Sequence, residues 1–176
     1  MKNFPLKILN FYLPVRDSEK GIALYPENLL DLNINTIMRK DPSVCFSKTT
    51  NGNDYNILIM KKDKNEINID KGLPIGGIIL EPDKEYRADK ENVNTIFINY
   101  WIEKGYRNKG FATKAVDLTC SILSKANSDF KINIKNIKAF INHDNLYSIK
   151  VVEACKFIEV EDPKYIKYGR TFVRSI

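Results

Sequence analysis

A short basic segment that contains a glycine carries the clearest chemical signature in this sequence of 176 residues. Backbone N–H groups at the start of a helix lack intrahelical partners and attract anions, and basic side chains beside them add full positive charges. A glycine at such a place lets the backbone approach a ligand closely. The segment therefore predicts a pyrophosphate-binding site, and its residues are Arg107, Asn108, Lys109, Gly110, Phe111 and Ala112.

Two other kinds of phosphate site are disfavoured by the same residues. Gly105 and Gly110 have the outer spacing of a P-loop, but Phe111 and Ala112 replace the Lys-Ser/Thr pair that reaches the terminal phosphates and magnesium. The glycine pattern of dinucleotide-binding folds is absent. A helix whose first turn carries solvated basic residues remains the alternative for this segment taken alone.

Hydrophobic patterns predict the elements that must position the segment. Residues 96–102 form a β-branched and aromatic run of strand length, and residues 103–106 turn the chain. Downstream, residues 112–123 carry one apolar stripe at three- and four-residue steps, which predicts a helix. A second strand follows at residues 137–141, and Asn145 is the expected cap of a second helix that continues to Phe157.

This ordered pair of motifs resembles the Gcn5-related N-acetyltransferase (GNAT) superfamily, above all the branch with the ribosomal-protein N-terminal and the spermidine acetyltransferases. The resemblance covers about residues 93–160. It implies a single α+β domain over residues 1–176, with a mixed, mostly antiparallel sheet of six to seven strands. It also implies a splayed parallel strand pair at a CoA site, helices on both faces, and acetyl-CoA as the acyl donor. The resemblance rests on Asn99 to Ile102, Tyr106 to Thr113, Asn145 to Ser148, and Lys156 with Phe157.

The resemblance also implies which residues hold the cofactor. In such enzymes the pantetheine arm lies like an extra strand in the gap between two parting strands. Tyr100, Trp101 and Ile102 match that place, where unpaired main-chain groups would bond the pantetheine amides. Arg107 to Thr113 match the diphosphate loop, and Asn145 matches a residue that contacts the arm near the thioester. Core packing is the alternative role for one residue of the alternating pair Tyr100 and Trp101.

Two positions depart from the family pattern. Many relatives have a tyrosine seven residues after the Asn145 position that protonates the departing thiolate, and this chain has Val152. Ser148 is the best-placed replacement; the alternatives are an ordinary helix-start serine and a thiolate that leaves without an acid. Lys156 replaces the usual glycine before the final aromatic residue, so we expect that turn to differ.

No general base stands out. Residues 93–102 contain no carboxylate; Glu103 is the nearest acid, with a solvated charge as its alternative role. His143 is the only histidine, a residue type that titrates near neutrality, but we interpret it as a loop residue and keep a water chain as an alternative. The acids from Glu81 to Glu91 alternate with cations and are interpreted as a solvated loop. Weak base candidates favour an α-amine or another easily deprotonated acceptor.

Composition and charge limit the classes of ligand and partner that we expect for this protein. Residues 1–90 hold 14 basic against 13 acidic residues and residues 91–176 hold 14 against 9, so the excess of the +6 net charge lies with the proposed CoA site. The absence of any run of five basic residues argues against direct nucleic-acid binding. Without an apolar run of about 18 residues or a hydrophobic leader, we expect a cytoplasmic protein and no membrane span. Cys45, Cys120 and Cys155 show no nucleophile, disulfide or zinc pattern, so we expect no metal.

Two classes of function follow. The first is an N-acetyltransferase in which a neutral amine attacks the thioester directly, without an acyl-enzyme, and a strand N–H stabilises the oxyanion. Its acceptor would be a protein N-terminus, a polyamine, an aminoglycoside-like amine or an amino-acid metabolite. The second is a non-catalytic acyl-CoA-binding sensor or interaction module, which Val152 keeps open. The sequence does not predict the oligomeric state.

The remaining elements are predicted with less detail. In the N-terminal half we expect a strand at residues 11–15, a helix that begins at Pro26, and strands at residues 56–61 and 75–80. A short pair of strands should flank residues 161–163 and end the chain.

Overall fold

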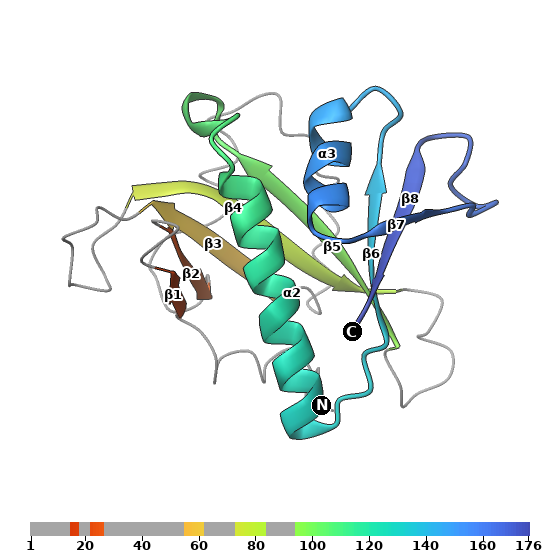
Figure 1. The fold of residues 1–176 in the computed structure, drawn as a ribbon, viewed down its shortest axis with the longest axis horizontal. Helices are drawn as coiled ribbons and strands as arrows, with labels where there is room; N and C mark the ends of the chain where they lie inside the picture. Colours follow the sequence, from red (N-terminus) through yellow and green to blue (C-terminus); the bar gives the residue numbers. More distant parts are fainter. Residues whose placement is uncertain (1–14, 18–21, 27–54, 62–72, 84–93) are drawn as a thin grey trace.

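The computed structural model describes residues 15–17, 22–26, 55–61, 73–83 and 94–176, and its strands form one sheet (Figure 1). The order across the eight described strands is β1-β2-β3-β4-β5-β6-β8-β7. Among these described strands only β5 and β6 pair in parallel, as expected for a mixed, mostly antiparallel sheet. The strands are β1 (Val15–Asp17), β2 (Ile22–Pro26), β3 (Tyr55–Lys61), β4 (Leu73–Pro82), β5 (Thr95–Ile102), β6 (Asn136–Ile141), β7 (Ile158–Val160) and β8 (Arg170–Ser175).

Two helices, α2 (Phe111–Phe130) and α3 (Leu146–Ala154), pack on one face of the sheet. The apolar stripe predicted for α2 is buried against β5, because Val116 and Leu123 join Ile98 in one core cluster. The opposite face is also covered, since Leu58 of β3 is fully buried outside that cluster. None of the described helices combines the length and apolar character needed to cross a bilayer.

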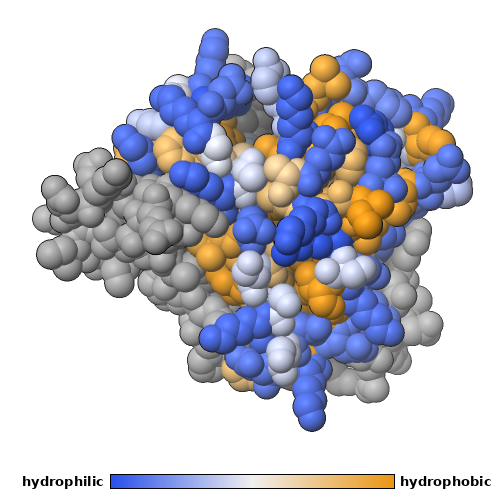
Figure 2. Space-filling model, in the orientation of Figure 1, coloured by the Kyte–Doolittle hydropathy of each residue, from blue (hydrophilic) through white to orange (hydrophobic). Residues whose placement is uncertain are grey.

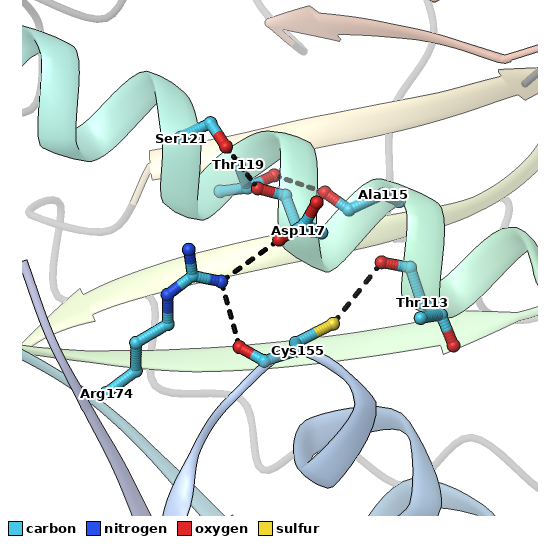
Figure 3. Close-up of polar contacts among 7 residues, drawn as sticks. All are labelled: Thr113, Ala115, Asp117, Thr119, Ser121, Cys155 and Arg174. Carbon is cyan, nitrogen blue, oxygen red and sulfur yellow. Dashed lines mark hydrogen bonds and ion pairs between the residues drawn. The ribbon is translucent and has the colours of Figure 1, made fainter. Parts of the chain in front are cut away.

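A polar cluster ties α2, α3 and β8 together (Figure 3). The guanidinium of Arg174 donates to Asp117 Oδ1 of α2 at 3.1 Å and to the carbonyl of Cys155, after α3, at 2.9 Å. The thiol of Cys155 in turn lies 3.4 Å from the carbonyl of Thr113 in the first turn of α2. These bonds fix the start of α2, which directly follows the basic segment, relative to the end of α3.

Most predicted elements are confirmed, and two interpretations were wrong. Pro26 ends β2 instead of beginning a helix, because residues 22–26 pair along their whole length with β3. The rest of that expected helix, and the expected strand over residues 11–14, lie outside the described residues. Glu81 and Asp83 do not lie in a solvated loop: β4 continues through Pro82, and Asp83 is buried with its N–H bonded to the Thr95 carbonyl at 3.1 Å.

The connection between β7 and β8 folds back on the sheet face opposite the helices. The ring of Tyr165 meets Phe97 of β5 at a centroid distance of 6.2 Å and Phe140 of β6 at 5.1 Å. Asp162 forms an ion pair with Lys138 of β6 at 3.7 Å. The connection is therefore anchored beneath the line along which β5 and β6 meet.

Candidate functional site: a gap between two strands and the loop at its mouth

The parallel pair β5 and β6 is joined over three residue pairs and then opens. Its register runs from Thr95↔Asn136 to Phe97↔Lys138, although β5 continues to Ile102 and β6 to Ile141. Figure 1 shows the two strands diverging from their paired ends, with α3 packed in front of the space between them. The centre of the sheet thus contains an interruption of strand pairing along the last part of β5, called the gap below.

The backbone of β5 shows which residues face this gap. Glu103 N–H donates to the Ile75 carbonyl at 2.8 Å, and Asp83 N–H to the Thr95 carbonyl at 3.1 Å. Because backbone groups alternate in direction along a strand, the odd-numbered residues of β5 face β4. The C=O group of Ile98 and the N–H and C=O groups of Tyr100 and Ile102 consequently point toward β6, beyond the last pair of the register.

Trp101 differs from its two neighbours. Its backbone is in register with Gly77 of β4 and so faces away from the gap. Its ring lies over Gly77, where an added Cβ would come within 2.0 Å of it. Of the three residues matched to the pantetheine position, Tyr100 and Ile102 thus offer main-chain groups to the gap, and Trp101 packs on β4.

The loop at the mouth of the gap has an unusual backbone. Asn108 and Gly110 have positive φ angles of 61° and 77°, while Lys109 between them does not. Such an alternation aims successive N–H groups at one point, as in anion-binding nests. Gly110 is the N-cap of α2 and makes no side-chain hydrogen bond. The first helical hydrogen bond runs from the Lys114 N–H to the Gly110 carbonyl. Three N–H groups therefore lack helical partners, those of Phe111, Ala112 and Thr113.

The two cations of the loop are fastened to the backbone around it. Arg107 Nε donates to the carbonyl of Ile102 at 2.8 Å, so it holds the last gap-facing carbonyl of β5. Lys109 Nζ donates to the Gly105 carbonyl at 2.9 Å and lies 5.5 Å from the centroid of the Tyr106 ring. Both residues are exposed. The positive charge is thus concentrated beside the uncapped helix start.

The other wall of the gap includes the start of α3. Asn145 caps this helix, since its Oδ1 accepts the Ser148 N–H at 3.1 Å, which leaves the Nδ2 of this exposed residue for other partners. The hydroxyl of Tyr100 donates to the Ser148 carbonyl at 2.9 Å and so links β5 to α3. Burial raises the pKa of Tyr100 well above its ordinary value, so this phenol stays neutral.

Val152 and Lys156 both belong to the C-terminal end of α3, which has a regular backbone conformation. Val152 is fully buried in the core and offers no proton-transfer group. Lys156 has a φ of 63°, the conformation in which glycine is unstrained, so the expected change in this turn does not occur. Phe157 N–H bonds to the Val152 carbonyl and Lys156 N–H to that of Glu153, both at 3.0 Å, which is a complete Schellman motif.

Glu103 and His143 belong to different loops, one after β5 and the other after β6. Glu103 is the residue directly after β5, with its backbone bonded to β4. His143 Nε2 lies 3.1 Å from the Ile166 carbonyl and lines an open hollow of about 380 Å³ together with Glu159, Arg170 and Thr171. Figure 2 shows apolar patches among charged groups on the helix-bearing face. Six of the exposed large apolar side chains fall within residues 146–168: Leu146, Tyr147, Ile158, Val160, Ile166 and Tyr168.

One polar pair near the gap was missed by sequence reasoning. Asn99 of β5 donates its Nδ2 to Glu81 Oε1 of β4 at 3.3 Å, and both side chains are half-buried. The signal was available only through strand register, which places Glu81 opposite Phe97 and thus on the same face as Asn99.

Comparison with known proteins identifies the fold. The chain matches the acetyltransferase (GNAT) domain family over residues 25–158, which is more than half of its length. No curated protein matches it significantly. Among solved structures, a domain from Methanocaldococcus jannaschii shares a TM-score of 0.64 at 15% identity, with 88% of this chain and 98% of that chain covered.

Two solved acetyltransferases are similar in fold. Mycobacterium smegmatis RimJ, in complex with CoA-disulfide, gives a TM-score of 0.60 at 12% identity over 89% of this chain and 83% of RimJ. A chimera of spermidine N-acetyltransferase SpeG from Vibrio cholerae and hSSAT gives 0.55 at 14% identity over 89% and 95%. These likenesses confirm the predicted fold class. The protein belongs to the GNAT acetyltransferase family.

Proposed function

We propose that this protein transfers an acetyl group from acetyl-CoA to a primary amine by direct attack of the amine. One observation carries the proposal: a parallel strand pair that is joined for only three residue pairs and then opens beside an uncapped, basic helix start. A gap edge of backbone groups followed by an anion site suits a ligand with amide groups and a pyrophosphate. Bound acetyl-CoA would supply the activated acetyl thioester.

The residues of the chain would share the binding as follows. Arg107, Lys109 and the N–H groups of residues 111–113 would hold the diphosphate. The gap-facing backbone of Ile98 and Tyr100 would pair with the amides of the pantetheine arm, and Asn145 Nδ2 would contact the arm near the thioester. A backbone N–H of the same strand edge would stabilise the oxyanion, since such donors act without reorganisation.

Protonation of the leaving thiolate has two possible sources on this wall. Ser148 lies at the start of α3 and is half-buried, so we keep it as the candidate acid. A thiol with an ordinary pKa of about 8.5 also leaves near neutral pH without help. Ser148→Ala separates the two: a lower kcat with an altered pH–rate profile supports Ser148 as the acid, and an unchanged pH–rate profile removes it from the mechanism.

The buried Val152 specifically favours the second function, a non-catalytic acyl-CoA-binding module. The two are distinguished by following thiol release from acetyl-CoA with a panel of spermidine, an alanine-initiated tripeptide and an N-blocked lysine tripeptide. Acceptor-dependent thiol release supports the transferase. Tight CoA binding without any such release contradicts it and leaves the binding module.

A further inference from the structure

The polar pair Asn99 and Glu81 lies on the face of the sheet opposite α2 and α3. Even-numbered residues of β5 face the helices, as the bond from Tyr100 to α3 shows, so Asn99 faces the other way. Asn99 follows Phe97, the last residue of β5 in register with β6, by two positions. The pair therefore sits beside the point where the gap opens.

The hydrogen bond between the two side chains sets their orientation. Asn99 Nδ2 donates to Glu81, so the amide oxygen Oδ1 is left as an acceptor. The carboxylate and this oxygen are both acceptors, and together they suit a ligand group that carries several N–H donors and positive charge. A primary amine or its ammonium form is such a group.

Three aromatic rings stand on the same face. Tyr165 packs edge-on against Phe97 and at a tilt against Phe140, which bridges β5 and β6 beneath the start of the gap. Aromatic faces attract cations, although Lys164 Nζ already lies 5.2 Å from the centroid of Tyr165. Phe97, which is in register with Glu81, and Phe140 thus give the alkyl part of an amine an apolar support on the face that carries the carboxylate.

The direction from which a nucleophile would approach the gap also points to this face of the sheet. The loop from Arg107 to Thr113 begins α2 on the helix face, so a cofactor held there enters the gap from that side. A nucleophile that attacks a carbonyl in the gap then has to come from the opposite face. That face is where Asn99 and Glu81 lie.

We propose that Asn99 binds the acceptor amine and that Glu81 takes its proton; this inference rests on the proposed function. Glu81 would remove a proton from the bound ammonium and pass it to solvent. The amine nitrogen then forms the C–N bond as the C–S bond breaks, its second proton goes to solvent, and the thiolate takes a proton from Ser148 or water. A carboxylate at this place extends the acceptors to strongly basic amines, beyond the α-amines that the sequence favoured.

Glu81→Gln tests the base, because glutamine keeps the shape and still accepts the Asn99 hydrogen bond. At pH 7, kcat/KM for the best amine of the panel should fall about 100-fold. The deficit should shrink about tenfold per pH unit toward the pKa of the amine, since neutral amine then needs no base. CoA affinity by calorimetry should stay within about twofold, which also reports an intact fold. Glu161→Gln, an exposed acid of the β7–β8 connection, is the matched control.

Asn99→Ala tests amine binding separately from turnover. Calorimetry of spermidine binding to the CoA-saturated protein should show about tenfold weaker affinity in Asn99→Ala and in Glu81→Gln, but not in Glu161→Gln. A deficit of Glu81→Gln that is equal at every pH, or no deficit at all, overturns the inference while the unaltered protein still turns over. If the unaltered protein transfers to no amine, the proposed function fails and this inference fails with it.

Discussion

The N-termini of α2 and α3 begin in opposite ways. Each helix start leaves backbone N–H groups without helical partners. In α3 the side chain of Asn145 bonds to the Ser148 N–H, so the helix supplies its own acceptor. In α2 the cap is Gly110, which has no side chain to offer, and Arg107 and Lys109 stand beside it.

The two helix starts thus differ in whether their free N–H groups find an acceptor within the protein. The start of α2 is complete only when an outside anion accepts its N–H groups, and its cations favour that anion. The start of α3 needs no ligand and instead holds the Asn145 amide in a fixed position. Substitutions at the start of α2 should therefore change the affinity for an anion, and substitutions at the start of α3 should change the free energy of unfolding.

The largest test of this contrast is Arg107→Glu. Loss of a charge-assisted bond to phosphate is worth about 1.5–3 kcal/mol, so CoA affinity should fall about tenfold to a hundredfold. Calorimetry at fixed ionic strength measures it. Lys150→Glu makes the same charge change on the exposed side of α3 and should have little effect. Equal losses in both variants would show that only net charge matters.

The buried Tyr100, which links β5 to α3 through its hydroxyl, should make the free energy of unfolding depend on pH in the alkaline range. Burial keeps Tyr100 neutral in the fold, while the unfolded tyrosine ionises above about pH 10. The unfolded state then binds fewer protons, so stability falls by up to about 1.4 kcal/mol per pH unit as pH rises above that value. Cys120, whose pKa burial raises to about 12, adds a fall in the same direction.

Tyr100→Phe should remove the Tyr100 part of that fall, while Tyr55, whose pKa burial also raises, keeps its own part. At pH 8 it loses only the bond to the Ser148 carbonyl, about 1 kcal/mol. Urea unfolding at pH 8 and pH 11 gives the comparison, and the variant should lose less stability between them than the unaltered protein. The same pH dependence in both proteins would mean that Tyr100 ionises in the fold.

Asn145→Ala should act on stability through the α3 cap. Loss of an N-cap costs about 1 kcal/mol, or about 2–4 °C in Tm for a chain of this size. Asn145→Asp keeps the cap oxygen and should restore stability, yet it lacks the Nδ2 that we propose contacts the cofactor. Full CoA affinity in Asn145→Asp would remove that contact from the site.

The smallest effect is expected at the other end of α3. A non-glycine residue in the left-handed region costs about 1–2 kcal/mol, partly offset by the greater flexibility of unfolded glycine. Lys156→Gly should therefore stabilise the protein by about 0.5–1 kcal/mol in urea unfolding. Gly105→Ala, at an exposed position with open space around it, serves as the control.

The sequence predicted most elements around the site because their signals are local. The run at residues 96–102, the apolar stripe of α2 and the Asn145 cap each depend on a few neighbouring residues. The strand at residues 22–26 was missed because its pairing with β3 outweighs the helix-start preference of Pro26.

The remaining differences depend on register, which a single sequence does not show. Which of Tyr100 and Trp101 turns its backbone to the gap is set by pairing with β4, through bonds such as that from Glu103 to Ile75. Glu81 looked like a loop acid because its partner in the strand ladder, Phe97, is distant in sequence. The residues matched to the cofactor stay predictions until binding is measured.

The short β5–β6 register has a consequence for how the protein unfolds. The two halves of the sheet, β1 to β5 and β6 to β8, are joined through three residue pairs of β5 and β6. Without a ligand, few hydrogen bonds therefore connect the two halves. A ligand strand in the gap would supply the missing hydrogen bonds to both sides. We expect CoA to slow amide hydrogen exchange in β5 and β6 together, and to make the two halves open as one cooperative unit.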